Sequence, residues 1–298
     1  MPDQQTMSTQ DFKSRFKDAI QIVDGPHPEY AVQLFKDLIL EASEDHLADN
    51  RIVIQLRMYL GSALWRSDVY AQAVPILEAA LEDAVRNLGW ENRITFSCSG
   101  NLCRALSSLG KIDEALRLAK MTYQKRIIAF GEFDNGTLNS LNHLAHLYFE
   151  AGDINRATSL MSTLYKRRSH AFGKSDSRTQ SSKHNLALMQ ARRDNNKQDL
   201  LNLLAELTNE FGPEHPSTIG VLEHLARMFE QNGQLEAALE TWREAELKFT
   251  HVFGEVALPT LATAQRRLMV QQALGDNQVD QQLAMVQETI SRISGQSI

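Results

Sequence analysis

The chain has 298 residues, of which 43% are apolar and 23% charged, so it can bury one large hydrophobic core or two ordinary ones. Its 15 glycines and 7 prolines are too few turn-forming residues for many short strands, which excludes an all-β sandwich or barrel. The formal net charge of -6, with no strongly basic stretch, argues against nucleic acid as a partner.

The cysteines and the amino terminus predict the compartment. Cys98 and Cys103 lie five residues apart in one expected helix, where their Cβ atoms point in different directions, so we expect two free thiols. Residues 1–11 lack the apolar segment of a signal peptide, and no run of about 18 apolar residues occurs in the chain. These features predict a soluble, cytoplasmic protein without a membrane partner.

A Leu-Gly or Phe-Gly pair recurs along the chain. Its glycines are spaced 42, 42, 39 and 42 residues apart, at Gly89, Gly131, Gly173, Gly212 and Gly254. A threonine stands six residues after each glycine, at Thr95, Thr137, Thr179, Thr218 and Thr260. Two independent markers in one register indicate an internal repeat.

Each period predicts two amphipathic helices, which we call helix A and helix B. Apolar residues recur at helical spacing in two segments, as in 141–148 and 154–165. Gly110, Gly152 or Gly233 divides the two segments and can adopt the left-handed conformation that ends a helix. The glycine that closes each period is expected to stop helix B. After Gly212 we expect Pro216 in the first turn of the next helix A, with Ser217 or Thr218 satisfying free amides there.

In chain order, we expect an atypical N-terminal repeat, then five repeats, then a C-terminal capping helix pair, at 5–47, 48–89, 90–131, 132–173, 174–212, 213–254 and 255–298. The first has helices at 9–22 and 30–43 and a longer loop, Asp24-Gly25-Pro26-His27-Pro28, in place of the tight turn. The repeat 174–212 is three residues short and carries Arg192 to Lys197 at the turn, so we expect irregular stacking there. The last pair is expected at 261–273 and 279–293.

The repeats share a pattern of large and small residues. They read Leu60-Gly61-x2-Leu64 with Ala73-x3-Leu77, Leu102-Cys103-x2-Leu106 with Ala115-x3-Ala119, Leu144-Ala145-x2-Tyr148 with Ala157-x3-Met161, and Leu225-Ala226-x2-Phe229 with Ala238-x3-Trp242. This pattern resembles the tetratricopeptide repeat, and the longer period with its Leu/Phe-Gly ending is similar to the kinesin light chain type. The resemblance covers nearly the whole chain. It implies an all-α fold, a right-handed superhelical solenoid of antiparallel helix pairs, as a single domain over 1–298.

The resemblance places a protein or peptide ligand on the concave face, which helix A residues line. The expected groove residues are Met58, Trp65, Arg104, Asn139, Asn142, His146, Phe149, His184, Glu223 and Arg227. Asparagine can hold a peptide backbone while arginine pairs with acidic groups. Asn142 is the leading candidate, because the family uses an asparagine in this Leu-Asn-x-Leu-Ala context on its groove. The alternative is that these are ordinary solvated positions.

Two further sets of residues have a structural interpretation. Trp242 falls at a signature core position, whereas Trp65 aligns with the groove and is expected to anchor a ligand. Basic pairs and triplets at helix B ends and at one turn, namely Lys125-Arg126, Lys166-Arg167-Arg168 and Arg192-Arg193, are expected to complement helix dipoles. A basic ridge that binds an acidic partner is the alternative.

No catalytic or cofactor motif is evident. His143, His146, Glu150 and His184 could be imagined as a metal cluster, but no HExxH or CxxC spacing supports it, so we expect no metal or other cofactor. The sequence predicts a non-enzymatic scaffold or adaptor that binds a peptide or protein segment. The alternative is a regulatory sensor whose superhelix changes shape on binding a short peptide or small ligand. The oligomeric state is not set by the sequence.

Overall fold

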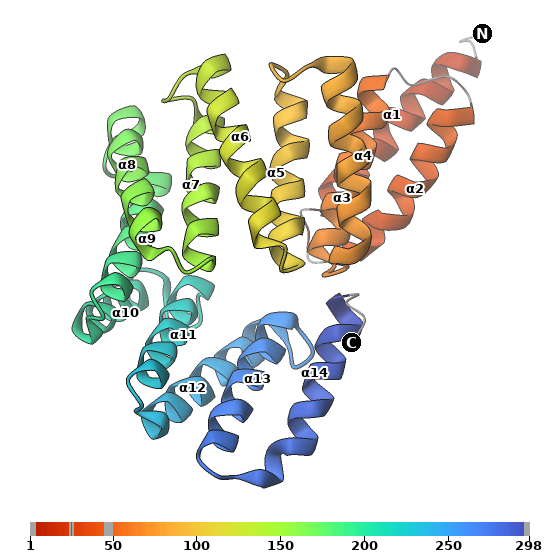
Figure 1. Ribbon diagram of the computed structural model, residues 1–298. Helices are drawn as coiled ribbons and strands as arrows, with labels where there is room; N and C mark the ends of the chain where they lie inside the picture. The colour runs from red at the N-terminus through yellow and green to blue at the C-terminus, as the bar shows by residue number, and fades with distance from the viewer. Residues whose placement is uncertain (1–3, 24, 26, 45–49, 295–298) are drawn as a thin grey trace. The chain divides into compact units, whose positions relative to one another are not determined.

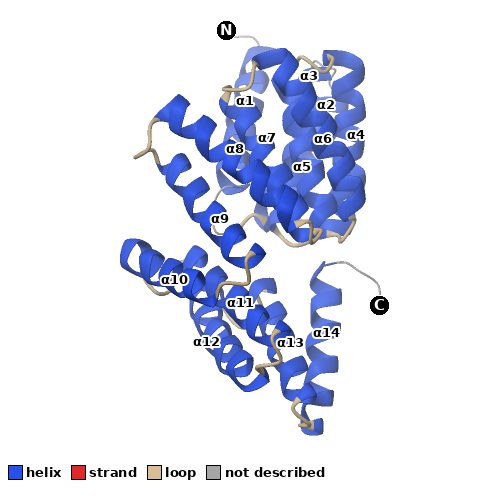
Figure 2. Cartoon of the chain, turned by 60° about the vertical axis from the view of Figure 1, so that its left-hand side comes forward, coloured by secondary structure: helices blue, strands red, loops and turns tan. Residues whose placement is uncertain are grey.

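The computed structural model describes residues 4–23, 25, 27–44 and 50–294, and within these residues the chain is all α-helical (Figure 1, Figure 2). Fourteen α-helices in this part of the chain pack as sequential antiparallel pairs, which confirms the predicted fold class. The expected boundary at residues 47 and 48, and Asp24 and Pro26 of the first loop, lie outside the described residues. None of the helices in the described ranges is long and apolar enough to cross a membrane.

The helices form two compact units, each with its own internal packing. Unit 1, Met1–Ala151, contains α1 (Gln4–Val23), α2 (Glu29–Glu44), α3 (Asn50–Arg66), α4 (Tyr70–Leu88), α5 (Arg93–Ser108), α6 (Ile112–Phe130) and α7 (Asn135–Glu150). The atypical first helix pair that the sequence predicts is therefore present as α1 and α2.

Unit 2, Gly152–Ile293, begins with the helix B that follows α7. Its elements are α8 (Ile154–Phe172), α9 (Ser177–Arg193), α10 (Lys197–Phe211), α11 (Pro216–Gln231), α12 (Leu235–Phe253), α13 (Leu258–Ala273), the short 3-10 helix η1 (Asn277–Val279) and α14 (Asp280–Ser294). The last helix pair lies where the sequence places it. The single domain over 1–298 and its right-handed superhelical course stay predictions.

Every repeated glycine ends a helix B in a conformation that other residues adopt only with strain. Gly89, Gly131, Gly173, Gly212 and Gly254 have φ between 75° and 93° and ψ between 163° and 172°. This region of backbone conformation is essentially restricted to glycine. The amide of Gly131 donates to the carbonyl of Ile127 at 2.9 Å and so closes the last turn of α6. The prediction that these glycines stop helix B is confirmed.

The repeated threonine has a matching hydrogen-bonding role. Its hydroxyl donates to the carbonyl of the glycine six residues earlier, at 2.7 Å for Thr95, 2.9 Å for Thr218 and 2.8 Å for Thr260. The threonine side chains are buried, which favours an internal partner for the hydroxyl. In these three repeats the bond ties the first turn of helix A to the end of the helix B before it. Oγ1 of Thr137 donates instead to the carbonyl of Arg126 at 3.4 Å, and Oγ1 of Thr179 has no hydrogen-bond partner within the described residues.

The turn between helix A and helix B also has one conformation throughout. Gly110, Gly152 and Gly233 adopt φ values of 82°, 82° and 71°, as predicted. Asp68 and Asn195 occupy the same place in two other repeats with φ of 63° and 49°. Aspartate and asparagine tolerate this region better than other side chains do. The short repeat therefore keeps the tight turn that its sequence had seemed to lose.

One of the expected helix caps is made differently. Pro216 lies in the first turn of α11 as predicted, but the amide of Ser217 donates to Nδ1 of His215 at 3.2 Å. The Thr218 hydroxyl is committed to Gly212. The capping residue is therefore His215, and the prediction of Ser217 or Thr218 as the cap is wrong because both lie one or two positions inside the helix.

Small residues allow the helices of each pair to approach closely. Cys103, Ala145 and Ala226 are 0–1% exposed, and a Cβ atom on Gly61 would collide with the side chain of Leu77. Cys98 and Cys103 are both free and buried, as predicted. Burial raises the pKa of each thiol to about 12, so both stay protonated at neutral pH.

Replacing Gly131 with alanine is expected to lower the free energy of unfolding by about 1–3 kcal/mol, because alanine is strained at this backbone conformation. Gly220 in the middle of α11 is the matched control, since a Cβ atom meets no neighbour at either glycine. Gly220→Ala is expected to raise the free energy of unfolding by about 1 kcal/mol through helix propensity. Urea unfolding followed by circular dichroism measures both, and changes of the same sign would contradict the explanation.

Candidate functional site

A pocket of about 480 Å³ in unit 1 collects four of the predicted groove residues. Arg104 projects into it from α5, and Asn139, Asn142 and His146 project from α7. The helices α5 and α7 are helix A of successive repeats, and Arg104 and His146 are 42 positions apart, so they occupy equivalent places on neighbouring helices. The repeat period itself therefore gathers these side chains around one hollow.

Other polar residues that line the pocket include Arg126 of α6 and His143 of α7, neither of which was among the predicted groove residues. Burial, with smaller contributions from Arg104 and His146, lowers the pKa of His143 to about 4. His143 is therefore neutral at pH 7. The positive charge of the pocket comes from the arginines.

Arg126 occupies a position that belongs to the hydrophobic core in other repeats. The equivalent residues in helix B of the repeats are Ala84, Arg126, Arg168, Leu207 and Phe249, and all five are buried. Three of these are apolar, so the fold does not need an arginine at this place. A charged group at a core position calls for a partner.

Within the described residues, the Arg126 guanidinium makes no hydrogen bond through its Nε. Its Nε is buried without a hydrogen-bond partner, and its Cζ lies 4.7 Å from the centroid of the Phe96 ring. Asp134, the nearest acidic influence, accepts from the Thr137 amide at 3.0 Å and pairs with Arg93 at 3.1 Å. Burial lowers the pKa of Arg126, and the negative charge of Asp134 raises it by a smaller amount. The attraction to Asp134 therefore does not fully offset the loss of water around the guanidinium.

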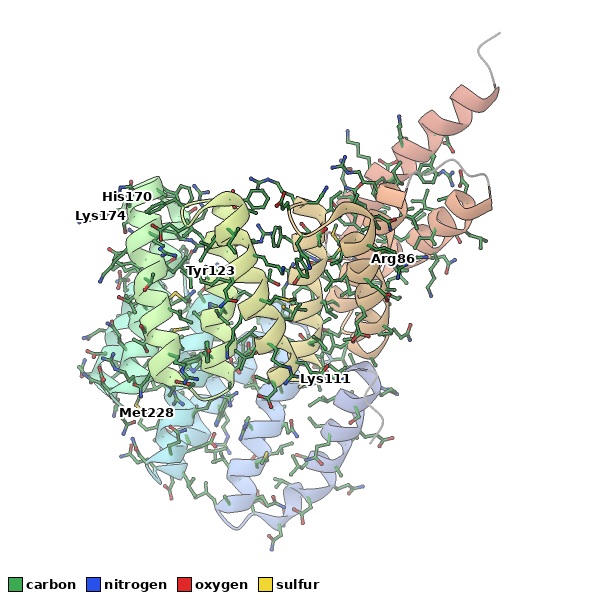
Figure 3. The ribbon with its side chains drawn as sticks, turned by 45° about the horizontal axis from the view of Figure 1, so that its top comes forward. Arg86, Lys111, Tyr123, His170, Lys174 and Met228 are labelled. Carbon is green, nitrogen blue, oxygen red and sulfur yellow. The ribbon has the colours of Figure 1, made fainter. Side chains whose placement is uncertain are left out.

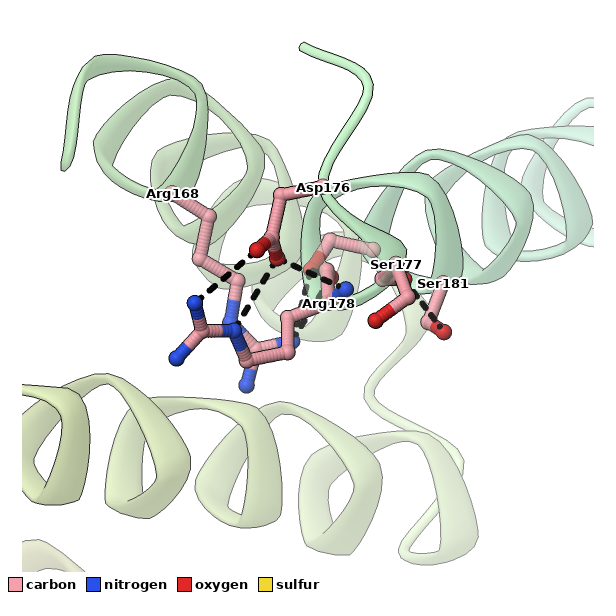
Figure 4. Close-up of polar contacts among 6 residues, drawn as sticks. Arg168, Asp176, Ser177, Arg178 and Ser181 are labelled. Carbon is pink, nitrogen blue, oxygen red and sulfur yellow. Dashed lines mark hydrogen bonds and ion pairs between the residues drawn. The ribbon is translucent and has the colours of Figure 1, made fainter. Parts of the chain in front are cut away.

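Arg168, the equivalent residue one repeat later, makes hydrogen bonds to the next helix through Nη1 of its guanidinium (Figure 4). Its Nη1 donates to the carbonyl of Arg178 at 3.0 Å and to Oγ of Ser182 at 2.9 Å. Asp176 beside it pairs with Arg178 at 2.9 Å, and this hydrogen bond lowers the pKa of Asp176 to about 2. At the position equivalent to Arg178, α7 has Gly136, which brings no side chain over Arg126.

Of the other polar groups of the pocket in the described part of the chain, Asn142 has an unbonded oxygen and Arg104 already makes a hydrogen bond. Oδ1 of Asn142 is buried and has no hydrogen-bond partner within the described residues. Arg104 donates to Oδ1 of Asn101 at 2.5 Å, and its Cζ lies 5.2 Å from the ring centroid of Trp65. Burial, followed by repulsion from Arg66, lowers the pKa of Arg104. An unpaired amide oxygen and two arginines thus border the same hollow.

Three other predicted groove residues of unit 1 lie elsewhere. Met58 is only 7% exposed and packs with Ile54, Ala80 and Ala84, so it offers little surface to a ligand. Trp65 is half-buried, and its Nε1 already donates to Oγ of Ser108 at 2.9 Å. Phe149 is half-buried near the end of α7.

Unit 2 contains the other predicted groove residues, His184, Glu223 and Arg227. His184 is 7% exposed and borders a second pocket of about 430 Å³ with Leu188 and Phe211. Glu223 accepts a hydrogen bond from Oγ1 of Thr263 at 3.3 Å, and burial raises the pKa of its carboxyl. Cζ of Arg227 lies 5.5 Å from the ring centroid of Trp242.

Unit 2 contains a group of potential metal ligands that differs from the one considered in the sequence. His143, His146 and Glu150 belong to α7, whereas His184 lies in α9 of unit 2. Within the described residues, His184 instead has Glu206 and Glu210 of α10 beside it, with ligand-capable atoms within 4.8 Å of one another. This second cluster crosses between two helices and is not visible in the spacing along either one.

The dipole interpretation of the basic residues holds for some helices and fails for two arginines. Arg86 on α4 and His170 on α8 lie in the last turns of their helices (Figure 3), as do Arg192 and Arg193 on α9. Arg126 and Arg168 are buried one turn earlier. They face the next helix A rather than the free carbonyls of their own helix.

Antiparallel helix pairs with a 42-residue period and glycine-ended helices define the class of α-helical repeat scaffolds. The family model described as "Tetratricopeptide repeat" matches residues 137–176, which confirms the predicted resemblance for this segment. Comparison with curated proteins gave no match.

Solved structures have the same fold at low sequence identity. Kinesin light chain nearly identical TPR-like repeats from Podosopora anserina share 19% identity over 69% of this chain and 98% of theirs, with a TM-score of 0.50. A tetratricopeptide repeat protein from Parabacteroides merdae shares 14% identity over 94% of this chain and 99% of its own, with a TM-score of 0.51. A signal transduction ATPase from Pyrococcus horikoshii with a tetratricopeptide repeat sensor shares 15% identity over 96% of this chain and 42% of its own, with a TM-score of 0.59.

Proposed function

We propose that this protein is a non-catalytic scaffold that binds an acidic segment of a peptide or partner protein at the α5–α7 pocket. Tetratricopeptide repeat proteins are generally protein-binding and usually non-catalytic, which supports the class of function. The observation that carries the proposal is the buried guanidinium of Arg126, which borders the pocket without a hydrogen-bond partner for its Nε.

The chemistry of the pocket favours a carboxylate ligand. A carboxylate can accept charge-assisted hydrogen bonds from arginine in a planar, two-point geometry. Arg126 at the base and Arg104 at the rim supply such donors, and Asn142 supplies an amide for the ligand backbone. An acidic side chain that enters the pocket would give the buried charge of Arg126 the compensation that the fold does not supply.

The experiment is a selection of twelve-residue peptides by phage display on the full chain, followed by affinity measurements on one selected acidic peptide by fluorescence anisotropy. Arg104→Glu and Asn142→Ala are each expected to weaken binding by about tenfold or more. Arg243→Glu, an exposed charge reversal on α12, is the control and is expected to bind like wild type. Selection of peptides without acidic residues, or equal binding by all variants, would refute the proposal.

A regulatory sensor is the second candidate function. It is supported by the fold similarity to the Pyrococcus horikoshii ATPase that carries a tetratricopeptide repeat sensor. A sensor must adopt two shapes, with and without its ligand, whereas a scaffold need not. Small-angle X-ray scattering with and without saturating peptide distinguishes them: a changed radius of gyration favours the sensor, and an unchanged one favours the scaffold.

A further inference from the structure

We propose that unit 2 contains a binding site for a divalent transition-metal ion such as Zn²⁺, formed by His184 of α9 and by Glu206 and Glu210 of α10. The site uses none of the residues of the α5–α7 pocket and does not depend on the peptide-binding function. One imidazole nitrogen and two carboxylate oxygens are ligands that zinc accepts, and three protein ligands leave a fourth position for water.

The geometry of the three side chains fits an ion between them. Glu206 and Glu210 are four residues apart on α10 and therefore share one face of the helix. Nε2 of His184 lies 3.6 Å from Oε1 of Glu206 and 3.5 Å from Oε2 of Glu210. These separations exceed ordinary hydrogen bonds. They are close to the roughly 3.3 Å between two atoms that are each about 2.0–2.1 Å from a tetrahedral zinc ion.

His184 supplies the independent sign of a ligand. Its side chain is 9% exposed, and its Nε2 is buried without a hydrogen-bond partner within the described residues. The ring is held edge-on against Phe211, with centroids 6.1 Å apart and an interplanar angle of 85°. A buried nitrogen that faces two carboxylates without a hydrogen bond is costly as it stands, and a bound cation would satisfy all three groups.

The two carboxylates give the ion a route to solvent. The side chains of Glu206 and Glu210 are 45% and 41% exposed, so the buried imidazole lies at the inner end of the site and the carboxylates at its outer end. This arrangement leaves room for water as a fourth ligand and lets a metal enter without opening the helix pair. The ligands come from two packed helices, so their positions are largely fixed before binding.

Lys183 competes with the metal for one ligand. Its Nζ donates to Oε1 of Glu206 at 2.6 Å. The ammonium must leave that oxygen when the metal arrives. Removing the ammonium is therefore expected to strengthen metal binding, an effect opposite in sign to the loss of a ligand.

The test uses the full chain after treatment with a chelator. Zn²⁺ binding is measured by competition with a chromophoric chelator, and Co²⁺ replaces zinc for its visible absorption, which reports direct coordination. We expect one Zn²⁺ per chain. Glu210→Gln and Glu206→Gln should each weaken Zn²⁺ about tenfold or more and reduce the Co²⁺ band. Lys183→Gln should tighten Zn²⁺ binding several-fold, and Glu240→Gln, an exposed glutamate on α12, should bind like wild type.

Loss of Zn²⁺ binding can be distinguished from unfolding, because the altered glutamates are partly exposed and their replacement is not expected to unfold the chain. Circular dichroism melting confirms that each variant is folded. Absence of stoichiometric Zn²⁺ binding by wild type would overturn the proposal. So would Zn²⁺ affinity in Glu210→Gln or Glu206→Gln equal to that of Glu240→Gln.

Discussion

Replacing Trp242 with alanine is expected to lower the free energy of unfolding by about 3–5 kcal/mol, the range for large aromatic residues removed from a packed core. Trp242 is completely buried in unit 2, in a cluster with Leu225, Ala226 and Ala238. Its Nε1 donates to Oε1 of Glu230 at 2.5 Å. The substitution therefore removes apolar contacts and also leaves the carboxylate of Glu230 without its donor.

Trp65→Ala is the matched control in the same residue type. The side chain of Trp65 is only half-buried and makes one hydrogen bond, to Ser108, so we expect a loss of about 1–2 kcal/mol. Urea unfolding of both variants, followed by circular dichroism, gives the comparison. Equal losses of unfolding free energy would mean that the repeat alignment, which places Trp242 in the core and Trp65 on the groove, does not distinguish core from surface.

The fold could be predicted from the sequence because its markers have a direct physical cause. Gly131 and its equivalents recur because the backbone there has φ and ψ values that disfavour other residues. Three of the repeated threonines, Thr95, Thr218 and Thr260, bind the glycine carbonyl through a buried hydroxyl. Signals of this kind are local, so they can be recognised in one sequence.

The tight turn of the short repeat shows where the same reasoning fails. The sequence has no glycine between Arg192 and Lys197, which suggested a lost turn. Asn195 supplies the positive φ instead. Asparagine is common in many environments, so its presence does not by itself predict a left-handed residue.

The candidate site was predicted less completely. Arg104, Asn139, Asn142 and His146 were identified from their places on helix A, but Arg126 belongs to helix B and was attributed to the helix dipole. A comparison of equivalent positions would have found it, since Ala84, Leu207 and Phe249 mark that place as apolar. An arginine at a position that is apolar in other repeats indicates a functional residue more strongly than its distance from a helix end does.

The burial of Met58 and His184 could not be predicted from the sequence, for another reason. Both lie on helix A positions that face solvent in an isolated pair, yet both are buried when neighbouring helices pack. Met58 is covered by residues of α4 and α5, and His184 faces the carboxylates of α10. Helical periodicity describes the face on which a residue lies but not what the next helix brings to that face.

Arg126→Met is expected to weaken the binding of an acidic peptide by about 10- to 100-fold, which corresponds to about 1.4–2.8 kcal/mol and is typical of a lost charge-assisted hydrogen bond. The same substitution is expected to leave the free energy of unfolding unchanged or to raise it by about 1 kcal/mol. The reason is that an incompletely compensated buried charge is replaced by an apolar side chain of similar length. Function and stability are therefore expected to change in opposite directions at this residue.

Arg168→Met is the control that the repeat provides. Arg168 occupies the equivalent position one repeat later, but its guanidinium donates to the Arg178 carbonyl and to Ser182, so its removal is expected to cost about 1–3 kcal/mol of stability without a loss of peptide affinity. Fluorescence anisotropy and urea unfolding on the two variants measure both quantities. A stability loss in Arg126→Met as large as that in Arg168→Met would make Arg126 a structural residue. If Arg126→Met loses peptide affinity and Arg168→Met loses stability, then the same position of the repeat binds ligand at Arg126 and stabilises the fold at Arg168.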